Sequence, residues 1–236
     1  MLTYSDASGV VCIGQAAHAW VSGQLARRWR PEPAPLAAVC LGAEQHDIGM
    51  AGWDRRPELN PDTGYPRTFL ELPRATHLAL WADAPHRILT QSPYAALLVS
   101  MHGHALFGGR EPAPEIERYL RGQEAFQADL LDRLDEDPAR ARCNQQLVWT
   151  LDYLALVGLI PAWAPREQTV GDQTIRVAVA SERRVTVDPW PFDGAAEITI
   201  AYPGRRLSEP SATDAELHDR LAAAPWVEVP VTWAAH

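Results

Sequence analysis

The segment AEQHDIGMAGWD, residues 43–54, places a histidine beside an aspartate where an apolar helical pattern should end. Apolar residues over 36–43 follow the i, i+3, i+4, i+7 spacing, and His46 and Asp47 continue that buried face. Imidazole nitrogen and carboxylate oxygen are both ligands for divalent transition metals. Successive helix positions differ by ~100°, so the pair can approach one ion from adjacent directions. A metal centre there requires further ligands from elsewhere in the chain.

Three other apolar segments carry such ligands. His18 lies on the apolar stripe of residues 18–29, and His102 lies on that of residues 94–105. Asp152 lies within one of the most apolar predicted helices and has no arginine within a turn. A single inward histidine is more often a hydrogen-bonded core residue, but an unpaired buried carboxylate costs several kcal/mol. The joint occurrence of these groups with the His-Asp pair therefore favours a metal centre.

Two further histidine pairs decide whether one or two ions bind. His102 and His104 differ by about 200° around a helix, so only one of them should face the His-Asp pair. We expect His102 to supply a second ion that shares Asp47, together with His77. His86 is the less favoured choice, because it follows a proline, where the helix should start or break. The alternative is that His77 and His102 only line a one-metal pocket.

The elements that must position these residues change character along the chain. From residue 15 to about 163, apolar residues recur at helical spacing between proline-rich joints, and Gly49 is the expected helix stop. After Pro165, valines and isoleucines alternate with polar residues as in strands, and the first residues can form a hairpin. One short helix interrupts this region, with Thr213 or Ser211 as its N-cap.

We therefore expect a mainly α protein, built on an all-helical core with a small antiparallel sheet. The sheet would combine the C-terminal segment with the N-terminal hairpin. The expected units are an N-terminal β-hairpin (1–14), a helical metal-binding domain (15–165) and a β-rich extension packed on it (166–236).

Composition restricts the partners. The 236 residues carry a net charge of -9, which disfavours a nucleic-acid polymer as partner and leaves a small-molecule substrate. No apolar run approaches the ~18 residues that cross a bilayer, and no signal peptide is recognisable, so no membrane association and a cytoplasmic location are expected. The three cysteines are far apart and suggest neither a disulfide framework nor a zinc site. These features leave open whether the protein forms a homodimer.

The order of these residues resembles the HD-domain superfamily of metal-dependent phosphohydrolases, which is matched as His18, His46-Asp47 and Asp152. The segments GQAAHAWVSGQLARRW, HDIGMAGWD, YAALLVSMHGHAL and DPWPF look like those of an uncharacterised bacterial family of HD-like proteins, over nearly the whole chain. That family usually has Asp-Gly-Trp after the His-Asp pair. Here residues 48–50 read Ile-Gly-Met, and tryptophan is delayed to Trp53.

The resemblance implies a metal-dependent hydrolase of a small phosphorylated metabolite or nucleotide. His18, His46, Asp47 and Asp152 would hold a divalent transition metal such as Fe, Mn, Co, Ni or Zn. A metal-bound water would attack phosphorus, with Asp47 as the catalytic carboxylate. The candidate substrate-binding residues are Gln15, Arg87 and Arg110.

Two other functions fit the same residues. Some HD-domain proteins with extra histidines bind two irons and use dioxygen to oxidise a carbon–hydrogen bond, for which His77, His86, His102 and His104 are candidates. A regulatory module that holds metal and ligand without turnover is the other alternative. Iron stoichiometry would separate the oxygenase from the hydrolase.

Overall fold

The computed structural model describes all residues, 1–236, and half of them are helical. The α-helices are α1 (Gln15–Ala26), α2 (Leu36–Gln45), α3 (Ala51–Arg55), α4 (Arg74–Ile88), α5 (Pro93–Gly108), α6 (Pro114–Arg133), α7 (Pro138–Val157) and α8 (Asp214–Ala223). Three short 3-10 turns are η1 (Ile48–Met50), η2 (Phe69–Glu71) and η3 (Pro161–Trp163). The helices therefore occupy most of the chain before residue 158.

The helix starts follow from local capping chemistry. The side chains of Ser92 and Asp137 accept hydrogen bonds from the first-turn amides of α5 and α7, each just before a proline at the first helical position. Thr213 caps α8 by accepting from the Glu216 amide at 3.2 Å, so the prediction of a short capped helix there is confirmed. Helix α4 continues through Pro85 to Ile88, so the expected helix break before His86 is wrong.

The strands form one large sheet. They are β1 (Leu2–Asp6), β2 (Gly9–Ile13), β3 (Arg166–Val170), β4 (Gln173–Ser181), β5 (Arg184–Asp188), β6 (Glu197–Leu207) and β7 (Trp226–Ala235). Their order across the sheet is β1-β2-β6-β7-β5-β4-β3, and β5 pairs with β7 in parallel while every other pair is antiparallel. The last strand in chain order thus joins two antiparallel halves.

The prediction of a mainly α, all-helical core with a small antiparallel sheet is wrong. Strands hold 23% of the residues, and the sheet has seven strands, is mixed in direction and curls around the helices. Two features account for the difference. Strands β6 and β7 are 11 and 10 residues long, beyond the short alternations visible in the sequence. In β3, only Gln168 and Val170 are buried, which leaves little apolar alternation to recognise.

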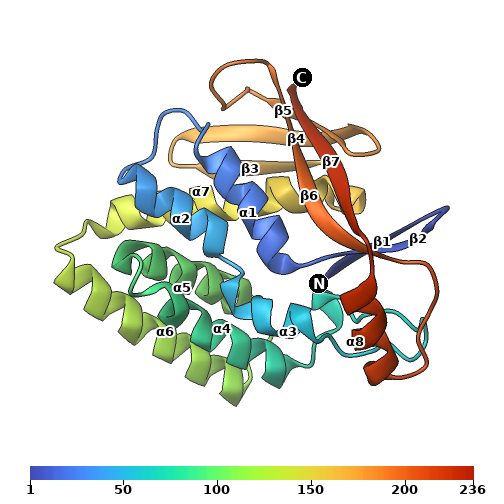
Figure 1. Cartoon of the computed structure of the whole chain (residues 1–236). Helices are drawn as coiled ribbons and strands as arrows, with labels where there is room; N and C mark the ends of the chain where they lie inside the picture. The colour runs from blue at the N-terminus through green and yellow to red at the C-terminus, as the bar shows by residue number, and fades with distance from the viewer.

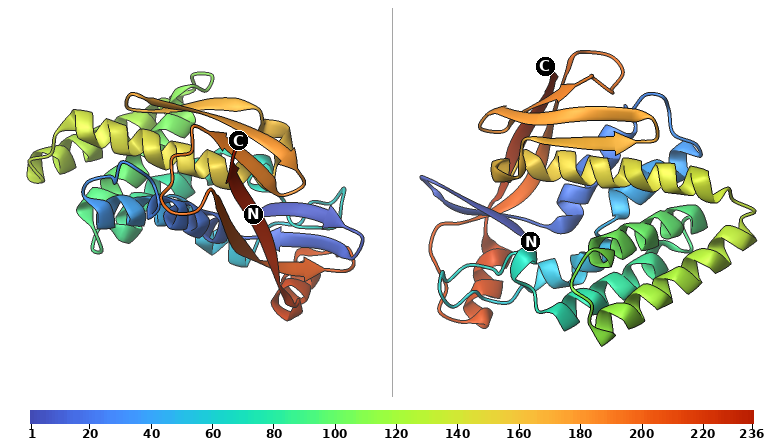
Figure 2. Two further views of the ribbon diagram at one scale, coloured as in Figure 1. Left: turned by 90° about the horizontal axis from the view of Figure 1, so that it is seen from above. Right: turned by 180° about the vertical axis from the view of Figure 1, so that it is seen from behind.

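Helix α7 connects the sheet to the helical layer. Figure 1 and the right-hand view of Figure 2 show α7 lying between the sheet and the layer of α4, α5 and α6. Two buried sheet side chains donate to α7 carbonyls: Tyr202 Oη to Ala155 at 2.7 Å and Trp233 Nε1 to Leu154 at 3.0 Å. One hydrophobic core of 44 buried residues includes side chains of both layers. The sheet therefore fixes the helix that carries Asp152.

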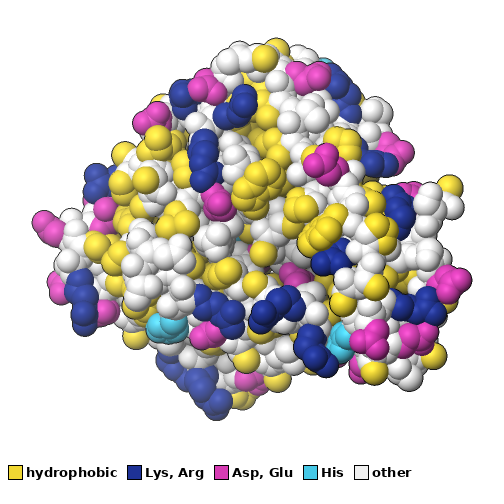
Figure 3. Space-filling model, viewed as in Figure 1, with side chains coloured by type: hydrophobic (Ala, Val, Ile, Leu, Met, Phe, Trp, Pro, Cys, Tyr) yellow, Lys and Arg dark blue, Asp and Glu magenta, His cyan; other side chains and the backbone are white.

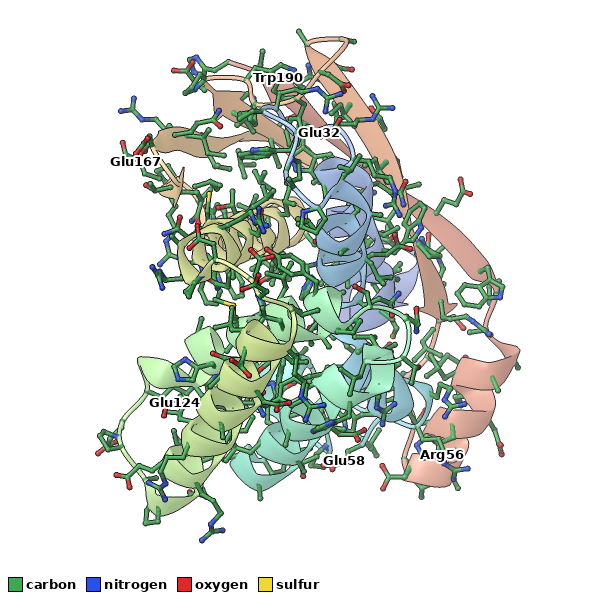
Figure 4. The ribbon with its side chains drawn as sticks, turned by 90° about the vertical axis from the view of Figure 1, so that its left-hand side faces the viewer. Glu32, Arg56, Glu58, Glu124, Glu167 and Trp190 are labelled. Atoms are coloured by element: carbon green, nitrogen blue, oxygen red, sulfur yellow. The ribbon has the colours of Figure 1, made fainter.

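The DPWPF segment packs on the helical part of the chain. The ring of Phe192 meets that of Trp29 edge to face, with centroids 5.6 Å apart, and the Arg30 amide donates to the Pro191 carbonyl at 2.7 Å. Trp190, labelled in Figure 4, lies at this end of the molecule, next to Phe192. The DPWPF segment therefore covers the core beside the residues that follow α1.

The surface carries charges of both signs. On the face shown in Figure 3, arginine and acidic side chains are interspersed with hydrophobic ones. None of the helices combines the length and the apolar character that crossing a bilayer would demand.

Candidate metal centre

Five buried side chains from four elements converge on one point below the sheet. From Nε2 of His18, the distances are 2.8 Å to Asp152 Oδ1, 3.2 Å to His46 Nε2 and 3.6 Å to Asp47 Oδ2. From Nε2 of His46, they are 3.3 Å to Asp152 Oδ1 and 3.5 Å to Asp47 Oδ2. His102 Nε2 lies 3.6 Å from the other carboxylate oxygen, Asp152 Oδ2.

These separations fit the edges of a metal coordination polyhedron. Ligands about 2.0–2.2 Å from one ion lie about 2.9–3.5 Å from one another in octahedral or tetrahedral arrangements. Two imidazole nitrogens 3.2 Å apart, as in His18 and His46, require a proton or a cation between them. The ligand atoms of His18, His46 and Asp47 lie within 4.8 Å of one another, and so do those of His46, His102 and Asp152. The residues present thus fit a divalent cation.

The backbone around His46 aims its ring and the neighbouring carboxylate. His46 is the C-cap of α2, and its Nδ1 lies 2.7 Å from the Ala43 carbonyl, which keeps the proton on Nδ1 and leaves Nε2 free as a ligand. Asp47 then leaves the helix at φ -100° and ψ 15°. A Cβ on Gly49 would lie 2.3 Å from the Leu80 carbonyl oxygen, so glycine allows η1 to approach α4. Gly49 is not the α2 stop predicted from the sequence, because the helix ends at Gln45.

Helices α1 and α7 are tied together beside the cluster. Ser22, one turn after His18, donates to the carbonyl of Leu151 at 3.2 Å. That bond fixes the register that places His18 opposite Asp152. All five residues of the cluster are buried, and Asp152 is the most exposed of them, with 9% of its surface accessible. Two rings, Trp81 and Trp149, flank His102 with centroids at 5.6 and 5.4 Å.

The electrostatics of the cluster favour cations. Burial raises the pKa of Asp47 and Asp152, but hydrogen bonds and charge from the neighbouring imidazoles outweigh burial and hold both pKa values below their usual range. Burial lowers the pKa of His46, yet the two carboxylates raise it well above its ordinary value. Burial lowers the pKa of His102 to about 4, so its ring is a neutral ligand at pH 7.

Three residues of the cluster, Asp47, His102 and Asp152, form the floor of a pocket of about 430 Å³. Aromatic and aliphatic side chains line its walls, and three arginines, Arg74, Arg110 and Arg166, line its exposed mouth. Arg74 pairs with Glu115 at 3.2 Å, whereas Arg110 and Arg166 have no carboxylate partner. The two arginines without carboxylate partners favour an anion at the mouth of the pocket.

The other predicted histidines lie at different depths. His77 lines the pocket wall, with its ring 5.4 Å from that of Phe107, but it is not part of the ligand cluster. Burial and the charge of Arg110 lower the pKa of His77 to about 4. His104 lies 3.3 Å from Glu124, which Figure 4 places on the outer helix α6. His86 is exposed on α4, away from the pocket.

The predicted substrate-binding residues separate into two groups. Gln15 lines the pocket, and its Nε2 donates to Asp47 Oδ2 at 3.3 Å while its buried Oε1 has no partner. The backbone N–H of Gln15 donates to Asp54 Oδ2 at 2.5 Å, which fixes the first turn of α1. Arg110 lies at the mouth. Arg87 is exposed, pairs with Asp83 at 2.6 Å and does not line the pocket, so its placement at the site is wrong.

Several pocket residues were not recognised in the sequence. Trp149 precedes Asp152 by three positions on one helix, so helical spacing alone could have indicated it. Arg74 and Arg166 come from a helix start and a strand start, and only the tertiary fold brings them to the mouth. Trp163, on η3, carries no sequence signal for the same reason.

Comparison with known proteins identifies the family but no activity. Residues 1–209 match the family described as "Protein of unknown function (DUF3891)", and the chain belongs to that family. No curated protein and no solved structure matches the chain.

Proposed function

We propose that the protein is a metal-dependent hydrolase of the HD type, which cleaves a small phosphorylated metabolite. The observation that carries this proposal is the convergence of His18, His46, Asp47 and Asp152, of which the two carboxylates line an arginine-rimmed pocket. When bound there, a divalent ion supplies an acidified water and neutralises charge on phosphoryl oxygens. The cluster combines two carboxylates with neutral imidazole ligands, a donor set that suits Fe, Mn, Co, Ni or Zn.

The remaining side chains supply binding and orientation. Arg110 and Arg166, without carboxylate partners, draw a phosphate toward the floor of the pocket. The unpartnered Oε1 of Gln15, held next to Asp47, accepts a hydrogen bond from a water or a substrate hydroxyl at the ligand cluster. Asp47 accepts the hydrogen bond from the Gln15 side chain and would bind the metal beside it, so we assign the catalytic role to this carboxylate. The apolar walls exclude other water from the floor.

The test combines metal content with phosphate release. Protein purified without chelators should hold about one divalent ion per chain and release phosphate from a panel of phosphate monoesters. Asp47→Ala should abolish both, and Asp47→Asn, which keeps the shape of the side chain, should also lose most of its metal. Arg87→Ala is the matched control at an exposed position, and it should keep both properties. Stoichiometric metal in a well-folded Asp47→Ala variant would refute the assignment.

A second candidate, a di-iron oxygenase, is favoured by one observation. His102 adds a second possible triad, with His46 and Asp152, and His77 lines the same pocket. Two irons per chain and substrate-dependent consumption of dioxygen would support this function over hydrolysis. His102→Ala should then lose one ion, whereas His104→Ala, two residues along the same helix, should lose none. If the protein holds metal but turns over neither phosphate esters nor dioxygen, the result would instead support a regulatory binding module.

A further inference from the structure

The walls of the pocket, between the ligand cluster and the arginines, are aromatic. Trp149 on α7, Trp163 on η3 and Phe69 on η2 all line it, and ten of its eighteen lining residues are hydrophobic. The rings of Phe69 and Trp163 meet edge to face, with centroids 6.3 Å apart. Rings from three separate elements thus enclose the space directly above the metal ligands.

The aromatic wall is held in place by the fold. Tyr153 is buried, and its hydroxyl donates to the Trp163 carbonyl at 3.1 Å, which ties η3 to α7. Trp149 packs on the His102 ring with centroids 5.4 Å apart. A wall with fixed rings binds a flat apolar group without first having to become ordered.

Neutral side-chain hydrogen-bond acceptors are scarce in this pocket. Apart from the ligand cluster and the arginines, side-chain acceptors are limited to Gln15, His77 and Tyr153, whose hydroxyl already donates to the Trp163 carbonyl. The three tryptophans of the pocket offer indole N–H donors but no acceptors. No serine, threonine or asparagine lines the pocket, and no carboxylate does so outside the cluster. A sugar with several hydroxyls would lose the hydrogen bonds that its O–H groups donate to water, and the pocket offers few acceptors to replace them, which lowers affinity.

We propose that the pocket selects phosphate monoesters of flat, apolar alcohols over those of polyhydroxylated alcohols. This inference rests on the proposed hydrolase function and names its substrate class. In the reaction, the oxygen of one water forms a bond to phosphorus as the bond from phosphorus to the ester oxygen breaks. The ester oxygen keeps the bonding pair and takes a proton, so the products are the free alcohol and inorganic phosphate.

Benzyl phosphate and ribose 5-phosphate make a suitable pair of substrates, because both release an alkyl alcohol. For the metal-loaded full chain, kcat/KM for benzyl phosphate should exceed that for ribose 5-phosphate by at least about tenfold. Trp149→Ala should remove most of this preference, and Trp149→Phe should keep it. Trp20→Ala, at an exposed position of α1, is the control and should leave the preference unchanged. Equal or reversed preference in the unmodified protein would overturn the inference.

Binding separates a failure of this inference from a failure of the hydrolase function. Benzylphosphonate and 2-hydroxyethylphosphonate carry the same anionic head and cannot release phosphate by ester hydrolysis. If no ester is hydrolysed, tighter binding of benzylphosphonate by the metal-loaded protein still supports an apolar ligand class. Tighter binding of the hydroxylated phosphonate would overturn that class even in an active hydrolase.

Discussion

Replacement of Gly103 by alanine should destabilise the protein through the packing of α5 on its neighbours. A Cβ at this position would lie 2.4 Å from the hydroxyl oxygen of Tyr119 on α6 and 2.9 Å from Cε3 of Trp81 on α4. Both partners are buried and lie between helices, so neither can move away freely. Gly103 also follows His102 directly, so the substitution probes the packing that holds this side of the pocket.

The magnitude follows from two opposing contributions. Alanine in place of glycine stabilises a helix interior by roughly 1 kcal/mol. Overpacking a dense core costs about 1–3 kcal/mol. Gly122, in the middle of α6, gives the matched control, because a Cβ there meets nothing within 4 Å. The propensity contribution cancels between the two variants, so Gly103→Ala should be less stable than Gly122→Ala by about 1–3 kcal/mol.

Chemical denaturation of the two variants and the parent protein measures these differences. Each kcal/mol should also change the melting temperature by about 2–4 °C for a chain of this size. Tyr119→Phe in the Gly103→Ala background should recover part of the loss, because it removes the nearest atom, and the Tyr119 hydroxyl has no hydrogen-bond partner. A Gly103→Ala variant as stable as Gly122→Ala would refute the packing argument.

Three further predictions concern proton release, the pH dependence of stability and the reactivity of the thiols. Burial lowers the pKa of His46, but the Asp47 and Asp152 carboxylates together outweigh burial and raise this pKa well above its usual value, so metal uptake by the metal-free protein should release protons near pH 7. Calorimetry in two buffers of different ionisation enthalpy measures that release, and none at pH 7 would contradict it. Because the folded pKa exceeds the unfolded one, His46 stabilises the metal-free fold fully below about pH 6.5 and loses this effect as pH rises through the folded pKa. Burial raises the pKa of Cys12 to about 12 and also raises that of Cys40, whereas Cys143 is half-buried. A disulfide reagent at pH 8 should therefore label Cys143 first in native protein, and equal rates at the three thiols would argue against this packing.

Helical periodicity carried most of the information about the candidate site. The apolar stripes put His18, His102 and Asp152 on inward faces, and the structure brings these three together with the His-Asp pair. The direction of a side chain on its own helix is a local property, so spacing can indicate it. The positions of Arg74, Arg166 and Arg87 relative to the pocket depend on which elements become neighbours, which no local pattern encodes.

The sheet was less predictable for a related reason. Alternation identified several strands of the C-terminal segment, but it contains no information on strand order. The parallel pairing of β5 with β7, with Arg184 opposite Thr232, follows from the long excursion through β6 and α8. Strand β6 also contains Pro203 and Gly204, which interrupt the apolar alternation by which strands are identified in a sequence.

The central position of β7 has a consequence for the order of events during synthesis. Strands β1, β2 and β6 form one half of the sheet and β5, β4 and β3 the other, and only β7 joins them. Residues 226–235 leave the ribosome after all the other strands. The two halves of the sheet therefore cannot be joined until these residues have been synthesised. Trp233 of the same strand contacts the turn of α7 that follows Asp152. We expect the candidate metal ligands to reach their final spacing only after this strand has inserted.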